Sequence, residues 1–274
     1  MFNAKVLADS TNLCGNRLIT MEMTYPRFIH AEHLRHRMFS FNVASSRAIP
    51  VEKMIEQVEK NPVIPIHWGK AQKGMQAYAE VSDTTKANCA FEWLHCRRAV
   101  ISSCKVMLEL GLHKQIINRL LEPWMWCTVI CTGNQGAWNN FWALRCHPEA
   151  EPHMQNIAEH TREAANASET DRLFEGDWHL PLIGFDGDDQ LSASDAVKVS
   201  AGRCARVSYL TMNGVRDTVK DIELHDRLAN SRHYSPFEHQ ATSSNDSSLE
   251  GNLGHGWLQY RKTINGEYQH LPSS

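Results

Sequence analysis

The sequence predicts a mixed fold of α-helices and β-structure, and two periodic segments carry this prediction. Residues 17–24 (RLITMEMT) alternate between two sets of side chains, as a strand does. Residues 84–111 carry apolar side chains at a period of about 3.6 residues and end at Gly111, a residue typical of helix C-termini. With 274 residues and 42% apolar side chains, the chain can bury a sizeable core without a metal or disulfide scaffold.

The two periodic segments also predict which side chains share a face. On the strand, Leu18, Thr20 and Glu22 lie on one side, and Ile19, Met21 and Met23 lie on the other. On the long helix, one stripe is formed by Ala90, Leu94, Ile101, Cys104 and Leu108.

A helix is predicted over residues 27–39, because Tyr25-Pro26 breaks the strand and Pro26 suits the first turn of a helix. One apolar sector of this helix would contain Phe28, Ala31, Leu34 and Met38. Arg35 falls inside the same sector. A buried guanidinium is costly unless acceptors meet it, so we expect a ligand or a fixed carboxylate there. A guanidinium that reaches the surface is the alternative.

Further helices are expected from periodicity and capping signals, over residues 51–60, 114–121, 137–145, 151–167, 192–205 and 219–231. Ser40–Pro50 is small and polar and is expected to be irregular. Residues 61–83 contain two prolines and two glycines and are expected to form an extended excursion. Residues 186–190 (DGDDQ) lack the spacing of a calcium loop, so a solvated link is expected.

Composition and charge exclude several classes of protein. A net charge of −3 and a pI near 6.6 are unlike a surface built for polyphosphate, so no stable nucleic-acid complex is expected. The first residues lack the basic and apolar runs of a signal peptide, and no stretch reaches the length of a membrane span. A soluble, cytoplasmic protein is therefore expected.

The eight cysteines show neither a paired C-x-x-C pattern nor the density of a secreted scaffold. We interpret them as reduced, buried structural thiols. Cys127 and Cys131 could share a helical face and, with His95 or His147, suggest zinc. The spacing fits no standard zinc site, so no metal is expected.

A second arginine extends an apolar helix face. Trp138, Phe141 and Trp142 form this face, and Arg145 continues it at i+7. A planar guanidinium with several donors suits phosphate or a pyrimidine edge, so a nucleotide is a reasonable shared ligand for Arg145 and Arg35.

A short loop offers the donors of a phosphate cradle. Ser45, Ser46 and Arg47 supply hydroxyl, backbone and guanidinium donors in consecutive positions. Ser-Ser-Arg also occurs in ordinary loops, which is the alternative interpretation.

Four motifs together resemble the flavin-dependent thymidylate synthase family. Arg35-His36-Arg37, followed after seven residues by Ser45, reproduces the RHR-x7-S signature, which Asn42 and Arg47 extend. The other three motifs are Ala205-Arg206-Val207-Ser208 (A-R-V-S), Ser235-Pro236-Phe237-Glu238-His239 ([ST]-P-F-E-H), and Asn140 with Leu144-Arg145 (N-x-x-x-L-R). Their neighbourhoods cover about half of the chain.

The order of these motifs differs from that of the usual family member. There, A-R-V-S and [ST]-P-F-E-H precede the strand and helix that bear RHR, whereas here residues 205–239 lie near the end of the sequence. A circular permutation would produce this order, and it is tolerable where surface termini lie close together. Residues 1–16 and the chain from Gln240 onward would then be new ends.

The resemblance implies an α+β fold with a long helix packed near an antiparallel sheet. It implies a single domain over residues 1–274, in which 17–50 bear the RHR motif, 84–170 are helical and 192–240 hold the permuted motifs. It also implies a homotetramer whose active sites take residues from several subunits.

The resemblance implies FAD as cofactor, 5,10-methylenetetrahydrofolate as carbon donor, NADPH as reductant, and dUMP or a related pyrimidine nucleotide as substrate. The implied flavin contacts are Arg35, His36, Arg37, Ser208, Ser235, Glu238, Asn134 and Asn140. The implied nucleotide contacts are Ser45, Arg47, Arg119 and Arg145. The implied catalytic residues are Arg145, near the pyrimidine ring, and His233, beside flavin and folate.

The implied reaction transfers one carbon to C5 of the pyrimidine, most directly from dUMP to dTMP, with hydride passing from N5 of reduced FAD toward C6. No cysteine takes the place of a nucleophile in the family's pattern. Ser45 is better interpreted as a ligand, because no His-Asp pair can be assigned to activate it.

The chain departs from the family's usual residues at Val43, Ala48, Gly136 and 151–155. In the resemblance these positions surround substrate and flavin. One alternative is therefore a hydroxymethylase or methylase acting on dUMP or dCMP. An alternative of another class is a non-catalytic nucleic-acid-binding protein on the same scaffold.

Overall fold

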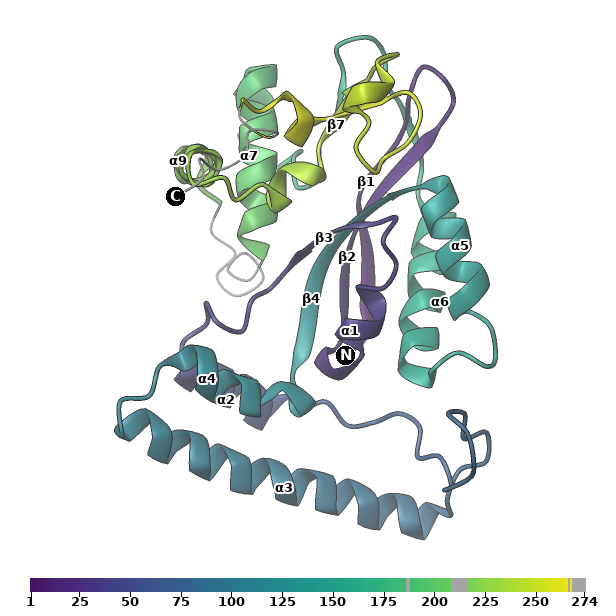
Figure 1. The fold of residues 1–274 in the computed structure, drawn as a ribbon, viewed down its shortest axis with the longest axis vertical. Helices are drawn as coiled ribbons and strands as arrows, with labels where there is room; N and C mark the ends of the chain where they lie inside the picture. The colour runs from purple at the N-terminus through teal and green to yellow at the C-terminus, as the bar shows by residue number, and fades with distance from the viewer. Residues whose placement is uncertain (186–187, 208–215, 266, 268–274) are drawn as a thin grey trace, which may run out of the picture.

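A computed structural model describes residues 1–185, 188–207, 216–265 and 267. Its centre is a five-stranded sheet in the order β3-β4-β2-β1-β5 (Figure 1). The strands are β1 (Asn3–Thr11), β2 (Arg17–Pro26), β3 (Ser40–Val43), β4 (Trp126–Asn134) and β5 (Asp171–Arg172). Neighbouring strands pair antiparallel, except β1 with β5. The expected mixed α and β fold is confirmed.

Most of the expected helices are confirmed to within two residues at each end. They are α2 (Val51–Lys60), α3 (Asp83–Glu109), α4 (Lys114–Leu120), α5 (Gln135–Arg145), α6 (Pro152–Ala167), α7 (Ala193–Ala205) and α9 (Thr218–Asn230). Among the described residues, no helix is both long and apolar enough to cross a membrane.

Strand β2 is buried on both faces, and its two predicted sets of side chains are confirmed. Ile19, Met21 and Met23 are fully buried against α5 and α6, which cover one face of the sheet (Figure 1). Leu18 and Thr20 face the opposite layer, which contains α7 and a second sheet. That sheet has the order β6-β7-β8, formed by Trp178–His179, Ala241–Ser243 and Trp257–Gln259.

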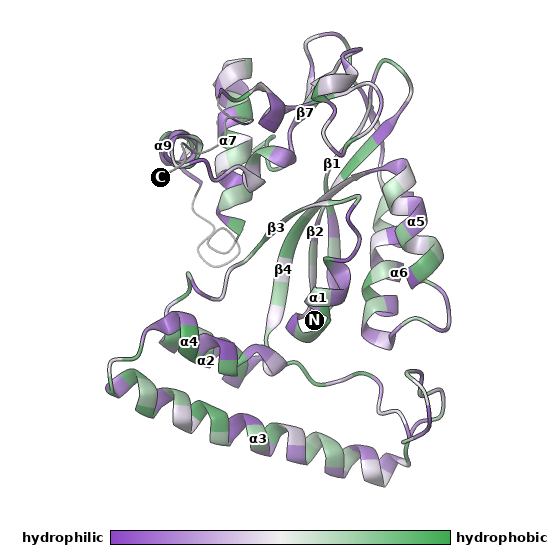
Figure 2. Cartoon of the chain, viewed as in Figure 1, coloured by the Kyte–Doolittle hydropathy of each residue, from purple (hydrophilic) through white to green (hydrophobic). Residues whose placement is uncertain are grey.

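The long helix α3 packs less closely than its apolar stripe predicts. Ile101 and Cys104 are buried, whereas Ala90, Leu94 and Leu108 are only partly buried. In Figure 1 this helix lies along one end of the molecule, with α2 and α4 between it and the sheet. Figure 2 shows apolar and polar residues mixed along its whole length, without one continuous apolar side.

The predicted helix over 27–39 is wrong. The segment forms a 3-10 turn, a single α-helical turn named α1 (His30–His33), and then further turns. The expected apolar sector is largely exposed, at 39% for Phe28, 44% for Leu34 and 47% for Met38. Arg35 is exposed as well, so the alternative interpretation, a guanidinium that reaches the surface, is the one that the structure supports.

The side chains that this segment buries instead are Ile29, His30, His33 and Phe39. The two histidine rings gain hydrogen bonds to the buried hydroxyl of Tyr25. These long-range contacts override the local helical pattern, which is why periodicity alone gave the wrong face.

Several strands lie where none was expected. Residues 40–50 are irregular only in part, because β3 pairs with β4. Strand β4 is buried on both sides over residues 129–133 and lacks the alternation of buried and exposed positions, as central strands do. The 61–83 excursion forms one bridge between Gly69 and Glu80, and the Ile66 amide donates to Nε2 of His153 on α6 at 3.0 Å.

A chain of buried hydrogen bonds crosses the sheet. Thr20 Oγ1 lies 2.7 Å from Thr132 Oγ1 and 2.8 Å from His179 Nε2. Thr132 Oγ1 lies 2.8 Å from His239 Nδ1, and His179 Nδ1 lies 3.0 Å from Ser10 Oγ. Burial lowers the pKa of His179 and of His239 to about 3. Both imidazoles are therefore neutral at pH 7.

A buried ion-pair cluster joins α7 to α9. Arg203, 1% exposed, donates to Asp188 at 2.7 and 2.8 Å and to Asp221 at 3.1 Å. Arg206, the arginine of A-R-V-S, also donates to Asp221. A Cβ at Gly202 would clash with the Asp221 backbone, so glycine permits the close approach of the two helices. Loss of either aspartate would leave buried positive charge uncompensated.

The two neutral histidines should make the fold sensitive to acid. Their folded pKa of about 3 lies below the unfolded value of about 6.5, so the unfolded state binds more protons between these values. The free energy of unfolding should therefore fall below pH 6.5, by about 1.4 kcal/mol per pH unit for each histidine. Urea unfolding at pH 7, 6 and 5 measures this slope.

His179→Gln should flatten the pH slope, because glutamine can bond Thr20 without gaining a proton. His95→Gln, at an exposed position on α3, is the matched control and should leave the slope unchanged. An unchanged slope in His179→Gln would show that this residue does not carry the acid sensitivity.

Candidate functional site

The first candidate pocket, named the RHR pocket, lies between the turns after α1 and one face of α5. It has a volume of about 290 Å³. Its principal lining residues are Arg35, His36, Arg37, Phe39, Asn140 and Arg145. Five residues implied by the resemblance are therefore brought together from two segments that are far apart in the sequence.

Arg145 is held in this pocket by acceptors from the opposite wall. Its Nε donates to His36 Nε2 at 2.9 Å, and its Nη1 lies 3.8 Å from Glu32 Oε2. Its side chain is 21% exposed, which agrees with an arginine that continues the apolar face of α5. Phe141 and Trp138, one and two turns earlier on that face, are fully buried.

His36 is a neutral acceptor. Burial first, and then the nearby charges of Arg145 and Arg35, lower its pKa to about 4. Because Nε2 accepts from Arg145, the proton of the neutral ring lies on Nδ1. The ring of Phe141 meets the imidazole edge-on, with centroids 4.9 Å apart. The orientation of Arg145 is therefore set by a ring that is itself held by the core.

The second candidate pocket, named the cradle pocket, has a volume of about 230 Å³. Its principal lining residues are Arg27, His30, Ser45, Arg47, Arg119 and Glu122. Three of the four implied nucleotide contacts lie here, and the fourth, Arg145, lies in the RHR pocket. Three guanidinium groups around one hydroxyl-bearing loop give this pocket a local positive charge on a chain of net charge −3.

Helix α4 holds the cradle loop in place. The fully buried Asn118 donates from Nδ2 to the carbonyls of Ser46 at 2.7 Å and Ile49 at 2.9 Å. Lys114 Nζ donates to the Ala48 carbonyl at 2.9 Å. The next residue along α4 after Asn118 is Arg119, so the same helix turn fixes the loop and supplies a cation to it.

A buried tyrosine–histidine chain lies between the two pockets. His30 lines the cradle pocket, and the Tyr25 hydroxyl lies 2.9 Å from its Nδ1 and 2.8 Å from Nδ1 of His33. The rings of His33 and His36 are 6.3 Å apart, and His36 lines the RHR pocket. Burial is the main cause that lowers the pKa of His30 to about 4 and that of His33 well below its usual range. The hydroxyl donates to one neutral ring and accepts from the other.

The remaining implied residues line neither pocket. Asn134 caps α5, where its Oδ1 accepts from the Ala137 amide at 2.9 Å. Glu238 accepts from Arg261, and Ser235 lies on the same 3-10 turn as Glu238. His233 is exposed after α9. Ser208 lies outside the described residues.

Several site residues were missed by reasoning from the sequence. Arg27, His30, Asn118 and Glu122 were not predicted to take part in the site. A histidine at His30 followed by one at His33 gives an i, i+3 pair next to a proline break, which is a weak signal. Asn118 carries no signal at all, because its role depends on a loop that is distant in sequence.

The thiols take no part in either pocket. Burial raises the pKa of Cys127, Cys131 and Cys204, so all three are protonated at neutral pH. The idea that Cys127 and Cys131 share a helical face is wrong, because both lie on strand β4.

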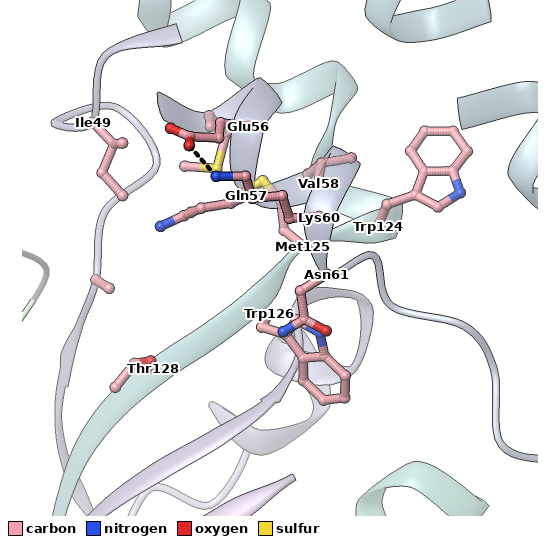
Figure 3. A pocket seen from close by; sticks show the side chains of 12 residues that line it. Ile49, Glu56, Gln57, Val58, Lys60, Asn61, Trp124, Met125, Trp126 and Thr128 are labelled. Carbon is pink, nitrogen blue, oxygen red and sulfur yellow. Dashed lines mark hydrogen bonds and ion pairs between the residues drawn. The ribbon is translucent and has the colours of Figure 1, made fainter. Parts of the chain in front are cut away.

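A larger cavity of about 430 Å³ lies between α2 and the start of β4, next to the cradle loop, whose residues Ala44 and Ile49 line it (Figure 3). Its wall includes Met54, Val58 and Met125 from the core and Lys60 and Asn61 from the rim. It contains none of the residues implied by the resemblance. Lys60 is paired with Glu56 across the rim, as Figure 3 shows.

The chain belongs to the family described as thymidylate synthase complementing protein, whose model matches residues 17–168. This range begins at the first residue of β2 and includes both candidate pockets. It leaves out the A-R-V-S and [ST]-P-F-E-H segments at 205–208 and 235–239. No curated protein matches the chain.

Solved structures resemble parts of the chain. One is a UMP/dUMP methylase PolB from Streptomyces cacaoi bound with 5-Br UMP, at 15% identity and a TM-score of 0.48 over 61% of this chain and 94% of that one. Another is the flavin-dependent thymidylate synthase ThyX from Helicobacter pylori complexed with FAD and dUMP, at 17% identity and a TM-score of 0.39. That match covers 54% of this chain and 67% of the other.

Removal of the Tyr25 hydroxyl should destabilise the region between the pockets. Tyr25→Phe leaves Nδ1 of both His30 and His33 without this partner, and each unsatisfied buried group costs about 1–3 kcal/mol. The free energy of unfolding should fall by about 2–4 kcal/mol in urea denaturation. Tyr78→Phe removes an exposed hydroxyl bonded to Glu149 and should change it by under about 0.5 kcal/mol. Equal effects of the two variants would contradict the bridging role.

Proposed function

We propose that this protein is a flavin-dependent enzyme that transfers one carbon from 5,10-methylenetetrahydrofolate to C5 of a pyrimidine deoxynucleotide, with dUMP as the first candidate. The observation that carries the proposal is the convergence of Arg35, His36, Arg37, Asn140 and Arg145 on one pocket. Membership of the family supports it, and the cradle pocket adds a positively charged site with room for a phosphate. NADPH is the proposed reductant.

The RHR pocket suits part of a flavin dinucleotide. Its guanidinium and amide donors suit a diphosphate or the polar edge of a ring, and Phe39 and Leu144 offer apolar surface. A volume of about 290 Å³ is at the lower end for ligand pockets, so the proposal takes further contacts from other segments. These contacts are Ser208, Ser235, Glu238, Asn134 and His233. When bound, reduced FAD supplies the hydride that the pyrimidine receives at C6.

The cradle pocket suits the phosphate of the nucleotide. Arg47 and Arg119 offer charged donors, Ser45 a hydroxyl, and Arg27 a further guanidinium. Glu122 lies 3.8 Å from Arg27 and balances part of this charge. A phosphate dianion would replace the repulsion among these cations by hydrogen bonds, which is the physical basis for binding here.

In the proposed mechanism, Arg145 stabilises the pyrimidine as its electron density changes. With Nε committed to His36, the two terminal nitrogens of Arg145 can donate to a pyrimidine carbonyl oxygen. Negative charge grows on that oxygen when C6 is attacked, and a fixed donor lowers the barrier most when its position is set beforehand. The overall change is balanced: dUMP, methylenetetrahydrofolate, NADPH and a proton give dTMP, tetrahydrofolate and NADP⁺.

The proposal includes a homotetramer with shared sites. The implied nucleotide contacts divide between two pockets of one chain. In the proposed tetramer, the RHR pocket of one subunit and the cradle pocket of another together form one active site. Large apolar side chains are exposed on and near α3 and α4, at Phe91, Val106, Leu110, Leu112, Ile116 and Leu120. Apolar surface of this extent is typical of an interface between subunits.

The proposal also includes a circularly permuted chain. His239, the last residue of [ST]-P-F-E-H, is bonded to Thr132, which is opposite Thr20 near the start of β2. The segment that precedes this strand in the usual family member therefore lies beside it in space, although 200 and more residues separate them here. This proximity supports a permuted order.

The first test is the absorption spectrum of the freshly purified protein. Oxidised flavin bands that fade with NADPH are expected, and the protein should then convert dUMP, with methylenetetrahydrofolate, to a product heavier by one carbon and two hydrogens. A product heavier by one additional oxygen would indicate hydroxymethyl transfer, and turnover of dCMP alone would change the substrate. Colourless protein that takes up no added FAD would refute the flavin proposal and, with salt-sensitive DNA binding, favour the non-catalytic alternative.

Two arginine variants should separate the roles of the pockets. Arg119→Ala should raise the dissociation constant of dUMP by about tenfold and leave FAD binding unchanged, because one charged donor is lost from the cradle. Arg145→Ala should lower kcat by about a hundredfold or more with little change in thermal stability. Arg227→Ala, at an exposed position on α9, is the control for both. A loss of dUMP affinity in the control equal to that of Arg119→Ala would show that the effect is one of net charge.

A further inference from the structure

The loop of residues 250–256, named the 250–256 loop, contacts the two elements that form the RHR pocket, the turns after α1 and helix α5, at points beside the pocket. It connects the 3-10 turn η5 (Ser247–Leu249) to β8 and lies outside the range matched by the family model. Figure 1 shows this C-terminal part of the chain beside the end of the sheet from which α5 begins. The loop is therefore a feature of this chain that the proposed function does not yet use.

Asn252 contacts the end of the RHR turns, where they lead into β3; of its partners there, Met38 lines the pocket and Ser40 does not. Its Oδ1 accepts from Ser40 Oγ at 3.1 Å, and its Nδ2 donates to the Met38 carbonyl at 3.5 Å. The Oδ1 atom also accepts from Gln259 Nε2 at 3.0 Å. Ser40 and Gln259 are 1% and 2% exposed and Asn252 is partly buried, so the first and third of these bonds are partly shielded from water. Asn252 thus joins β8 to the end of the RHR turns.

The next two residues contact Asn134, which caps the start of α5 and lies outside the pocket lining. The Leu253 carbonyl accepts from Asn134 Nδ2 at 2.9 Å, while Asn134 Oδ1 caps the helix through the Ala137 amide. Gly254 has a φ of +86°, and a Cβ there would lie 2.7 Å from Asn134 Nδ2. Glycine therefore permits both the turn and the close approach.

The loop itself is held by the core. Leu253 and Trp257 are fully buried with Leu18. The His255 carbonyl accepts from Asn12 Nδ2 at 3.1 Å and from Asn16 Nδ2 at 3.0 Å, in the turn between β1 and β2. A loop fixed at both ends and in the middle can set the positions of the groups that it touches.

We propose that Asn252 is a positioning residue that sets the spacing between the RHR turns and helix α5, and thereby the affinity of the RHR pocket for a flavin dinucleotide. The inference rests on the proposed function and deepens it. A segment after [ST]-P-F-E-H thus braces the two elements that form the pocket, so the proposed permutation has a physical consequence. The new C-terminal region supplies a brace between elements that the family model contains.

The test uses the full-length chain and two readouts. Asn252→Ala should increase amide hydrogen exchange about fivefold or more in residues 36–41 without any added ligand, because the brace on Met38 and Ser40 is lost. It should also raise the dissociation constant of FAD, measured by quenching of flavin fluorescence, by about tenfold. The KM for dUMP should stay unchanged, because the loop's partners Met38, Ser40 and Asn134 lie outside the lining of the cradle pocket.

Matched variants separate positioning from general destabilisation. Asn230→Ala makes the same change at an exposed asparagine on α9 and should alter neither readout. Asn252→Asp keeps the acceptor for Ser40 and Gln259 and should restore most of the FAD affinity. Ser40→Ala removes the Ser40–Asn252 hydrogen bond from the Ser40 side and should reproduce the effect of Asn252→Ala. It keeps the inference testable if Asn252→Ala folds poorly.

The outcomes distinguish this inference from the proposed function. Wild-type protein that binds FAD, together with an Asn252→Ala variant of unchanged affinity and exchange, overturns the positioning role and leaves the flavin proposal intact. Wild-type protein that binds no FAD overturns the proposed function. If the wild-type protein binds no FAD, unchanged amide exchange in Asn252→Ala also refutes the positioning role of Asn252. Raised exchange in residues 36–41 would instead support that positioning role without a flavin.

Discussion

The pairing of β2 with β4 is the constraint on which the candidate site depends. Nine residue pairs place Leu18 opposite Asn134 at one end and Pro26 opposite Trp126 at the other. Strand β3 then joins β4 on its other side, with Ser40 opposite Thr132. Residues 27–39 must therefore return along the sheet, and α5 starts beside the place where they arrive. This geometry allows Arg145 to meet His36, although neither segment encodes the contact.

Neutral polar groups hold this framework together on both faces of the sheet. On one face, Thr20 and Thr132 link His179 to His239, and on the other, Tyr25 links His30 to His33. Burial keeps these imidazoles uncharged, so they can accept and donate without the desolvation penalty of an ion. Such networks specify one arrangement of the chain more strictly than apolar packing does, because each misplaced group would be left without a partner.

The arginines show the opposite behaviour. Arg203 is buried and fully paired with aspartates, and it stabilises the joint between α7 and α9. Arg35, Arg37, Arg47 and Arg119 are exposed, at the mouths of the two pockets. Arg145 lies between these extremes, because its Nε donates to His36 while its side chain stays partly exposed and its terminal nitrogens can bind a ligand. The degree of pairing therefore separates the arginines that support the fold from those that can meet an anionic ligand.

Residue patterns alone determined the spans of most helices, the two faces of β2 and the family, because caps, periodicity and short motifs act over a few neighbouring residues. They also named the residues of both pockets that carry the motifs, such as Arg35, Ser45 and Arg145. Only the tertiary structure decided that residues 27–39 bury histidines and expose Arg35, and that His36 meets Arg145 across 109 positions of sequence. It alone placed Asn252 against Ser40, 212 positions away. Such contacts depend on the summed energies of strand pairing and burial, which no local window of the chain contains.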